Sequence, residues 1–293
     1  MLPSEIIERY RIRKGEKFRL DDIDPGDTTG LDIDKAQAKE LLETGVKRLS
    51  GLQERLYAGR RWALLMILQG IDTAGKDGVI KQVMSGVNPQ GCHVTSFKAP
   101  SDSDLDHDFL WRTTLALPAR GRIGIFNRSY YEETVVVRVH PELLARQRLP
   151  EQLITPDIWK QRFEDINNFE LHLARNGIIP IKFYLHISKK EQLRRLLARI
   201  DDPNKRWKFA HGDVEERALW DAHAHAYEET IRHTATPEAP WYVVPADHKW
   251  FTRLVVAATL VEHLKALDLH FPKLSDVEIE ALEKARAVLT APK

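Results

Sequence analysis

The stretch "LLMILQGIDTAGKDGVIKQVM", residues 64–84, decides the fold class of this chain. Its first part is a short apolar run, typical of a strand covered on both faces, and from Lys76 it has the pattern of a helix. The loop between them, Gly70 to Asp77, matches G-x-x-x-x-G-K, in which backbone N–H groups and a lysine face an anion. We therefore predict a phosphate-binding loop, although Asp77 stands where a hydroxyl residue is usual. An ordinary tight turn into a helix is the less favoured alternative.

Composition limits the other possibilities. The chain has 293 residues, 43% of them hydrophobic, which is enough for one large α/β domain or two smaller ones. Its net charge of +1 gives no whole-chain signal for nucleic acid or membrane. The single Cys92 cannot form an internal disulfide, and no signal-peptide pattern or membrane-length apolar segment is evident. We expect a soluble cytoplasmic protein.

The same alternation of strand and helix recurs along the chain. Apolar runs at 62–68, 93–99, 122–129, 178–188 and 241–246 predict five buried strands, and helical patterns are found near 33–59, 101–114, 159–173, 189–200, 248–268 and 276–290. This order predicts a parallel sheet with helices on both faces and a ligand at the carboxyl ends of the strands. Residues 1–29 are charged and turn-rich, so we expect an irregular arm followed by a single domain, 30–293.

A second motif, "IGIFNRSYYEE" (123–133), ends the third predicted strand. Many phosphate-loop enzymes have a magnesium-binding acid here, whereas this chain has Asn127 followed by Arg128. Asp72 in the loop then becomes the leading magnesium-binding carboxylate, with Asn127 as a ligand through water or a hydrogen-bonding partner, and Arg128 as a clamp on phosphate. For Tyr130 and Tyr131, packing at the edge of the core is as good an interpretation as function.

Residues 189–211 form a basic stretch with eight Lys/Arg against three acids. Leu193, Leu196, Leu197 and Ile200 predict the buried face of a helix, which places Arg195 and Arg199 outside it, one turn apart, where an anion would relieve their repulsion. With the helical hairpin that follows, we interpret about 189–233 as a lid over the phosphate loop. A solvated helical face and a basic nucleic-acid patch are the alternatives.

Several catalytic classes lack their motifs. No G-x-S-x-G, no H-E-x-x-H, no paired cysteines and no guanine-specific N-K-x-D occur, so acyl transfer, zinc chemistry and GTPase activity are not indicated. His223 and His225 are two apart on a predicted helix and face different sides, so they indicate surface or packing roles rather than a metal pair. Phosphoryl transfer between two phosphates, in contrast, needs no general base and calls for a lysine, arginines and magnesium.

Four motifs together resemble one family, from about residue 30 to 270. They are G-x-D-x-A-G-K-D-G (70–78), F-N-R-S-Y-Y-E (126–132), D-P-N-K-R-W-K-F (202–209) and W-Y-V-V-P-A-D-H-K-W-F (241–251), and they closely resemble the polyphosphate kinase 2 family. The resemblance implies a thymidylate-kinase-like P-loop fold, a three-layer α/β sandwich. It also implies dependence on Mg²⁺, with Mn²⁺ as a substitute, and a homo-oligomer, dimer or tetramer. The implied reaction is reversible phosphate transfer between inorganic polyphosphate and AMP, ADP or ATP, with guanine nucleotides as further candidates and no nucleic-acid or membrane partner.

The resemblance also assigns residues. Asp72, Lys76 and Arg128 fall on family functional positions, Arg206 lies in the matching lid motif, and Asp77 belongs to the family's loop. Our predicted catalytic residues are Asp72, Lys76, Asn127, Arg128 and Arg206. Our predicted phosphate or nucleotide contacts are Gly70, Thr73, Ala74, Gly75, Lys76, Asp77, Gly78, Lys81, Arg128, Tyr131, Arg195, Arg199 and Lys208. A metal is expected at Asp72 and Asn127, with Asp77 as a further candidate ligand.

Asn127 also bears on the acceptor. Many members of the family carry aspartate there, and the asparagine form resembles the subclass that phosphorylates nucleoside monophosphates as well as diphosphates. Removing one negative charge eases the approach of a phosphate dianion to the metal site. Our hypothesis is polyphosphate-driven conversion of AMP to ADP and of ADP to ATP. The alternatives are a conventional ATP-dependent nucleoside monophosphate kinase and a non-catalytic nucleic-acid-binding protein.

Overall fold

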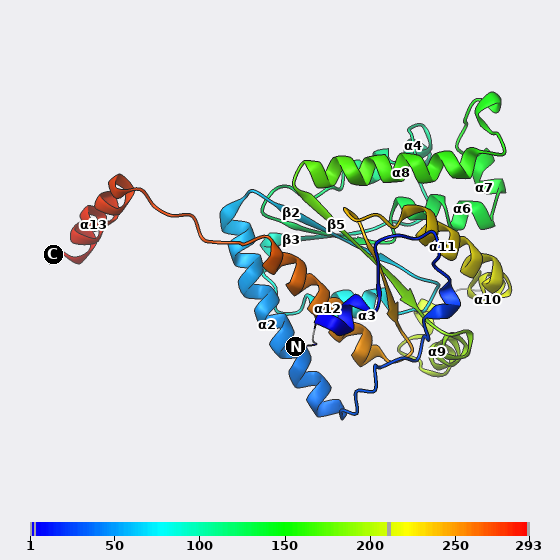
Figure 1. The fold of residues 1–293 in the computed structure, drawn as a ribbon, viewed down its shortest axis with the longest axis horizontal. Helices are drawn as coiled ribbons and strands as arrows, with labels where there is room; N and C mark the ends of the chain where they lie inside the picture. Colours follow the sequence, from blue (N-terminus) through cyan, green and yellow to red (C-terminus); the bar gives the residue numbers. More distant parts are fainter. Residues whose placement is uncertain (1, 3, 210–211, 292–293) are drawn as a thin grey trace.

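A mixed six-stranded sheet forms the centre of the molecule (Figure 1), and the computed structural model describes residues 2, 4–209 and 212–291. The strand order is β1-β6-β5-β2-β4-β3. The strands are β1 (Arg11–Ile12), β2 (Ala63–Gln69), β3 (Cys92–Ser96), β4 (Ile123–Asn127), β5 (Ile178–His186) and β6 (Trp241–Pro245). β2 to β6 pair in parallel, and β1 adds an antiparallel edge to β6.

Helices lie on both faces of this sheet. The helices of the described residues are α1 (Ser4–Glu8), α2 (Lys35–Gly59), α3 (Lys76–Val83), α4 (Asp102–Leu105), α5 (Trp111–Thr114), α6 (Val136–Val139), α7 (Glu142–Ala145), α8 (Ile158–Arg175), α9 (Lys189–Asp201), α10 (Gly212–Ala218), α11 (Trp220–Thr234), α12 (Lys249–Ala266) and α13 (Asp276–Thr290), of which α13 does not contact the sheet. The long predicted helices are present. α2, for example, begins with a capping box in which the Asp34 carboxylate accepts from the Gln37 amide and the Gln37 side chain accepts from the Asp34 amide.

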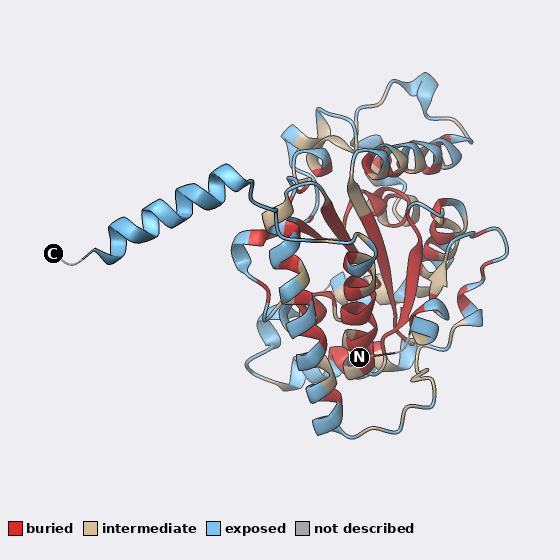
Figure 2. Ribbon diagram, turned by 60° about the vertical axis from the view of Figure 1, so that its left-hand side comes forward, coloured by how far each residue is buried: buried red, intermediate tan, exposed pale blue. Residues whose placement is uncertain are grey.

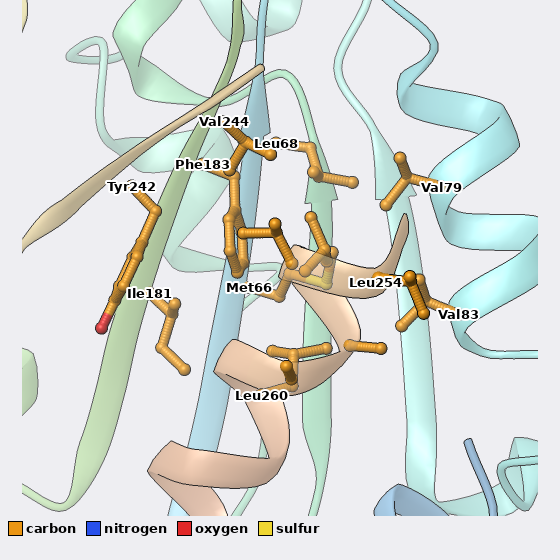
Figure 3. Close-up of a cluster of buried hydrophobic side chains, with 14 of the residues drawn as sticks. Met66, Leu68, Val79, Val83, Ile181, Phe183, Tyr242, Val244, Leu254 and Leu260 are labelled. Carbon is orange, nitrogen blue, oxygen red and sulfur yellow. The ribbon is translucent and has the colours of Figure 1, made fainter. Parts of the chain in front are cut away.

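The alternation of side chains along the strands divides the core into two layers. Leu64, Met66 and Leu68 of β2 pack with α3 and α12 on one face (Figure 3), whereas Leu65 and Ile67 pack with α8 and α11 on the other. The four central strands, β2, β4, β5 and β6, are therefore almost wholly buried (Figure 2). A strand covered on both faces has a continuous apolar sequence, which is why β2 could be predicted from the sequence alone.

The strand register places the sequence motifs at one edge of the sheet. Leu68 of β2 pairs with Asn127 of β4 on one side and with Phe183 of β5 on the other. The loop after β2 and the Asn127-Arg128 pair after β4 therefore leave the sheet side by side. The predicted ligand edge is thus a direct result of parallel pairing.

Four details differ from the sequence predictions. The sheet has six strands rather than five, and β3 is an exposed edge strand in which Val94 is 47% exposed. The helix predicted over 101–114 is two short helices, α4 and α5, because the Asp108 carboxylate accepts from the Leu110 amide and interrupts the helix between them. The N-terminal arm is not wholly irregular, since it contributes α1 and β1. Helix α11, which we expected within the lid, packs Tyr227 and Ile231 into the core.

The C-terminal helix α13 projects from the rest of the molecule and has no buried residue (Figure 2). Its apolar side chains, such as Leu289 with 85% exposure, lie in solvent. Among the described residues, no helix is both long enough and apolar enough to cross a membrane.

Candidate active site

The loop between β2 and α3 has the geometry of an anion cradle. Gly70, Thr73 and Gly75 all have positive φ, at 155°, 68° and 110°. A Cβ on Gly70 would lie 3.0 Å from the Leu185 carbonyl oxygen, so the close approach to β5 requires glycine. Gly75 is the N-cap of α3 and offers no side chain, so the first-turn N–H groups of this helix stay available to a ligand.

Helix α9 holds this loop from behind. Gln192 donates its side-chain amide to the Asp72 carbonyl oxygen at 3.2 Å, and Arg195 donates to the carbonyl oxygens of Thr73 and Ala74 at 3.1 and 2.9 Å. Three consecutive carbonyl groups are thus bound on the α9 side. The loop is fixed in shape before any ligand arrives.

Arg195 itself corrects the predicted helix face. Its side chain is only 6% exposed, whereas Leu193, Leu197 and Ile200 are 43%, 50% and 42% exposed. Besides the two loop carbonyls, it donates to the carbonyl oxygens of Ala246 and Asp247 and to the Glu191 carboxylate. All five guanidinium N–H donors therefore have protein partners, which favours a supporting role for Arg195 over the predicted contact with phosphate. Its role in the structure is to support the loop.

Lys76, Asp72 and Arg128 form the charged centre of the site. The Lys76 ammonium donates to the Gly70 carbonyl oxygen at 2.6 Å, and the Arg128 guanidinium pairs with the carboxylates of Asp72 and Glu132. Burial and the nearby Arg128 charge lower the pKa of Lys76 to about 8, against the opposing effect of Asp72. Burial opposes ionisation of Asp72, but the Lys76 and Arg128 charges prevail and lower its pKa. Arg128 has φ of 64°, a strained conformation that is common at functional sites.

Oxygen ligands for a divalent cation gather at the same place. Asn127 donates its side-chain amide to the Asp77 carboxylate at 2.8 Å, which leaves the Asn127 amide oxygen directed elsewhere. Asp72, Asp77 and Asn127 all line one cavity. Carboxylate and amide oxygens suit Mg²⁺, which usually takes one or two protein carboxylates and completes its shell with water and phosphate. The donor set therefore fits the expected cation.

Two cavities meet at this edge of the sheet. The first, which we call the basic cavity, has a volume of about 570 Å³ and is lined by ten lysines and arginines but only two acids, Asp72 and Asp77. The basic residues are Lys76, Lys98, Arg128, Arg194, Arg195, Arg199, Lys205, Lys208, Lys249 and Arg253. The second, the adjoining cavity, has a volume of about 390 Å³ and shares Phe97, Lys98 and Arg128 with the first.

Most of the predicted contacts line the basic cavity. These are Asp72, Thr73, Ala74, Gly75, Lys76, Asp77, Gly78, Asn127, Arg128, Arg195, Arg199 and Lys208. Thr73 is of interest because its hydroxyl is buried without a hydrogen-bond partner. Residues 210 and 211 of the basic stretch lie outside the described residues.

Four predicted residues are not in the lining of the basic cavity. Gly70 shapes the loop, and Lys81 is exposed on α3. Arg206, in the 3₁₀ turn Arg206–Lys208, donates to the Ile200 carbonyl oxygen. Tyr131 is fully buried and donates to Glu170, so its predicted ligand contact was wrong and the core-packing interpretation was right.

Several basic residues were missed by the sequence reasoning. Lys249 and Arg253 are one turn apart at the start of α12, and Arg194 and Lys205 flank residues that we had selected. Burial and the nearby Arg195 charge lower the pKa of both Lys249 and Arg253, as expected for cations crowded without an anion. Lys249 and Arg253 could have been predicted from their position just after β6, because that strand ends at the same carboxyl edge of the sheet as the phosphate loop.

Comparisons with known proteins identify the same family that the sequence motifs resemble. The Polyphosphate kinase 2 family model matches residues 32–272. An ADP-polyphosphate phosphotransferase of Rhodopseudomonas palustris is 47% identical over 283 residues, which are 96% of this chain and 98% of that protein. An AMP/ADP-polyphosphate phosphotransferase of Meiothermus ruber is 43% identical, with 91% and 96% covered. The crystal structure of polyphosphate kinase 2 from Arthrobacter aurescens TC1 superposes with a TM-score of 0.87 at 40% identity, covering 99% of this chain and 98% of that one.

Proposed function

This chain belongs to the polyphosphate kinase 2 family, and from that premise we propose that it transfers phosphate from inorganic polyphosphate to nucleotides. The observation that supports this most directly is the basic cavity at the phosphate loop, because nine cationic side chains besides Arg195 exceed what one nucleotide phosphate group requires. A polymeric anion offers enough charges to contact them. The names of the Rhodopseudomonas palustris and Meiothermus ruber relatives point to the same donor.

We assign polyphosphate to the basic cavity and the acceptor nucleotide to the adjoining cavity. The adjoining cavity has the size of an ordinary small-molecule site and is lined by Phe97, Tyr130, Val136 and Val137, which suit a base. Glu132 also lines it, and its Oε1 is buried without a hydrogen-bond partner, so it can accept from a ribose hydroxyl or a base amino group. The acceptor phosphate then lies at Arg128, where the two cavities meet.

Transfer in this arrangement requires alignment and charge stabilisation. An acceptor phosphate is already anionic near neutral pH, so no general base is needed. Lys76 and the first-turn N–H groups of α3 bind the donor phosphate, and Arg128 orients the acceptor by its position at the junction. When bound by Asp72, Asp77 and Asn127, Mg²⁺ or Mn²⁺ supplies further positive charge at the transferred phosphate.

Asn127 supports acceptance of monophosphates as well as diphosphates. AMP carries its phosphate dianion directly at the reaction centre, and a neutral amide opposes its approach less than a carboxylate would. The Meiothermus ruber relative, named as an AMP/ADP enzyme, is consistent with this. We propose that both AMP and ADP are acceptors, with guanine nucleotides as further candidates.

We also propose the domain bounds, the moving part of the lid and the oligomeric state. The sheet and its ligand edge support a P-loop kinase-like domain over residues 30–293, preceded by the arm 1–29, and residues 292 and 293 lie outside the described residues. The moving part of the lid is proposed to be α10, because α9 is bonded to the phosphate loop and α11 is anchored in the core. A homo-oligomer, dimer or tetramer, is proposed from the family resemblance.

The test is a donor and acceptor matrix. Purified protein is incubated with Mg²⁺, polyphosphate and either AMP or ADP, and the products are separated by chromatography. ADP should form from AMP, and ATP from ADP. If only ADP is converted, acceptance of monophosphates is refuted. If ATP but not polyphosphate serves as donor to AMP, the conventional nucleoside monophosphate kinase is correct.

A further inference from the structure

Three side chains of the types that bind metal ions meet at a place that the proposed reaction does not use. His140 follows α6, Glu216 lies on α10 and His223 lies on α11, and their ligand atoms are all within 4.8 Å of one another. The Nε2 atoms of His140 and His223 lie 2.9 and 2.7 Å from the two carboxylate oxygens of Glu216. The two imidazoles thus converge on one carboxylate.

The surroundings of His140 are those of a metal ligand. Its other ring nitrogen, Nδ1, is 3.3 Å from the Glu142 carboxylate. A carboxylate at this position favours the tautomer with hydrogen on Nδ1 and leaves the Nε2 lone pair free, as in many metal-binding histidines. The Nε2 atom is buried, and despite its distance to Glu216 it has no partner with hydrogen-bond geometry.

The ligand types and their exposure define the cation. Side-chain exposure increases from 9% for His223 to 22% for His140 and 37% for Glu216, so an ion can enter from one side and keep water as a further ligand. Two imidazoles and one carboxylate suit Zn²⁺ and related transition metals, whereas Mg²⁺ prefers oxygen ligands. We propose that His140, Glu216 and His223 form a transition-metal site, of the Zn²⁺ type, separate from the oxygen ligands at the phosphate loop.

Such a site would act on the lid. Glu216 lies on α10, whereas His223 is on α11, which is packed in the core. On the same helix, Arg217 donates to the Gln192 side chain, and Gln192 in turn holds the Asp72 carbonyl of the phosphate loop. A bound ion therefore fastens α10 to the core next to the residues that support the loop. Its expected effect is a more stable protein with a more ordered lid.

The experiment uses the full chain, stripped of metal with a chelator and returned to buffer with excess Mg²⁺, which keeps the oxygen ligands of the loop occupied. Zn²⁺ binding is measured by titration calorimetry, and Co²⁺ provides a visible absorption spectrum that reports nitrogen ligation. One Zn²⁺ per chain is expected. His140→Gln should lower the affinity by at least about 100-fold, since even outer partners of metal ligands contribute about 10- to 100-fold.

Two further variants make the test specific. Glu142→Gln keeps all three ligands and should weaken Zn²⁺ binding by about tenfold through loss of the carboxylate at Nδ1. His225→Gln is the matched control, because His225 is exposed on α11, the helix of His223, and lies outside the cluster. This variant should bind Zn²⁺ with the affinity of the unmodified chain. Zn²⁺ should raise the melting temperature of the unmodified chain and of His225→Gln, but not of His140→Gln.

The proposal is wrong if the unmodified chain binds no Zn²⁺ under these conditions. It is also wrong if His140→Gln binds with unchanged affinity, or if His225→Gln loses as much affinity as His140→Gln. A normal circular dichroism spectrum of each variant establishes that a loss of binding is not a loss of fold. None of these measurements depends on phosphate transfer, so the metal-site proposal and the proposed function can be refuted independently of each other.

Discussion

Replacing Arg195 with methionine should damage both the stability of the protein and the phosphate loop. Methionine keeps much of the aliphatic length but removes all five N–H donors. Four backbone carbonyl groups then lose their donor, and the Glu191 carboxylate keeps only its pair with Arg194. Because the Arg195 side chain is 6% exposed, water can replace these donors only in part.

The magnitude follows from this burial. Each lost hydrogen bond to a buried carbonyl or to Glu191 costs about 1 kcal/mol, so together they lower the free energy of unfolding by about 3 to 5 kcal/mol. For a chain of this size that corresponds to a decrease of about 6 to 20 °C in melting temperature. Since the loop is positioned through the Thr73 and Ala74 carbonyls, we also expect kcat to fall by about 100-fold, as for a reacting group displaced by about 1 Å.

The neighbouring Arg194 provides the control. Arg194→Met removes the same charge from the same cavity, but the Arg194 side chain is 65% exposed and bonds to Glu191 alone among the described contacts. An exposed ion pair contributes about 1 kcal/mol at most, so a melting temperature within about 4 °C of the unmodified chain is expected. The difference between the two variants isolates loop support from cavity charge.

Differential scanning calorimetry and initial rates with polyphosphate measure both quantities. Arg195→Lys should be intermediate, because an ammonium has three donors for five acceptors. Equal melting temperatures for Arg194→Met and Arg195→Met would refute the reasoning. So would an Arg195→Met protein with unchanged kcat and an increased KM for polyphosphate alone, which is the behaviour of a phosphate ligand.

Four further predictions concern the reacting groups and the adjoining cavity. Lys76→Ala should abolish transfer with the circular dichroism spectrum unchanged, and full activity would refute the loop assignment. The pKa of Lys76 is about 8, so the KM for polyphosphate should rise as pH increases through that value, because the cation that attracts phosphate is lost. Above pH 8 the folded state binds fewer protons than the unfolded state. The free energy of unfolding should therefore increase over the same pH range. Lys76→Arg should flatten the KM profile, and a profile with the same inflection would contradict this. Asn127→Asp places a carboxylate opposite Asp77. It should reduce the initial rate with AMP relative to that with ADP by about tenfold, which corresponds to about 1.4 kcal/mol. An unchanged ratio of the two rates would show that Asn127 has no role in acceptor choice. Val136→Trp should fill part of the adjoining cavity and raise the KM for AMP without changing the KM for polyphosphate; the reverse result would mean that the two cavities have been assigned the wrong way round.

The sequence predicted the ligand edge because its signals are local. A strand buried on both faces requires a continuous apolar run, and an anion loop requires glycines at a fixed spacing, here Gly70 and Gly75, so about 20 residues of sequence are enough to predict β2 and the loop. Parallel pairing then places the ends of β2 and β4 together, which brought Asp72, Lys76, Asn127 and Arg128 into one cavity.

Helix α9 shows where a local pattern fails. Its leucines indicate an apolar face, but the surface beneath it is the backbone of the phosphate loop, whose carbonyl groups require hydrogen-bond donors. Gln192 and Arg195 therefore face inward, while Leu193 and Leu197 are exposed. Which side of a helix is buried depends on the chemistry of the surface that it meets, and the helix's own periodicity does not contain that information.

Tertiary structure alone decided the remaining features. Lys249 joins the basic cavity because β6 ends beside β5, and that cavity is lined by segments from Asp72 to Arg253 that are well separated in the chain. His140, Glu216 and His223 have no recognisable spacing, so no sequence motif could reveal their convergence. The sequence by itself determined the strands, the loop and the residue types available for phosphate chemistry. The packing of distant segments determined which of those residues face the ligand and which support the fold, because side-chain direction is set by contacts that the local sequence does not encode.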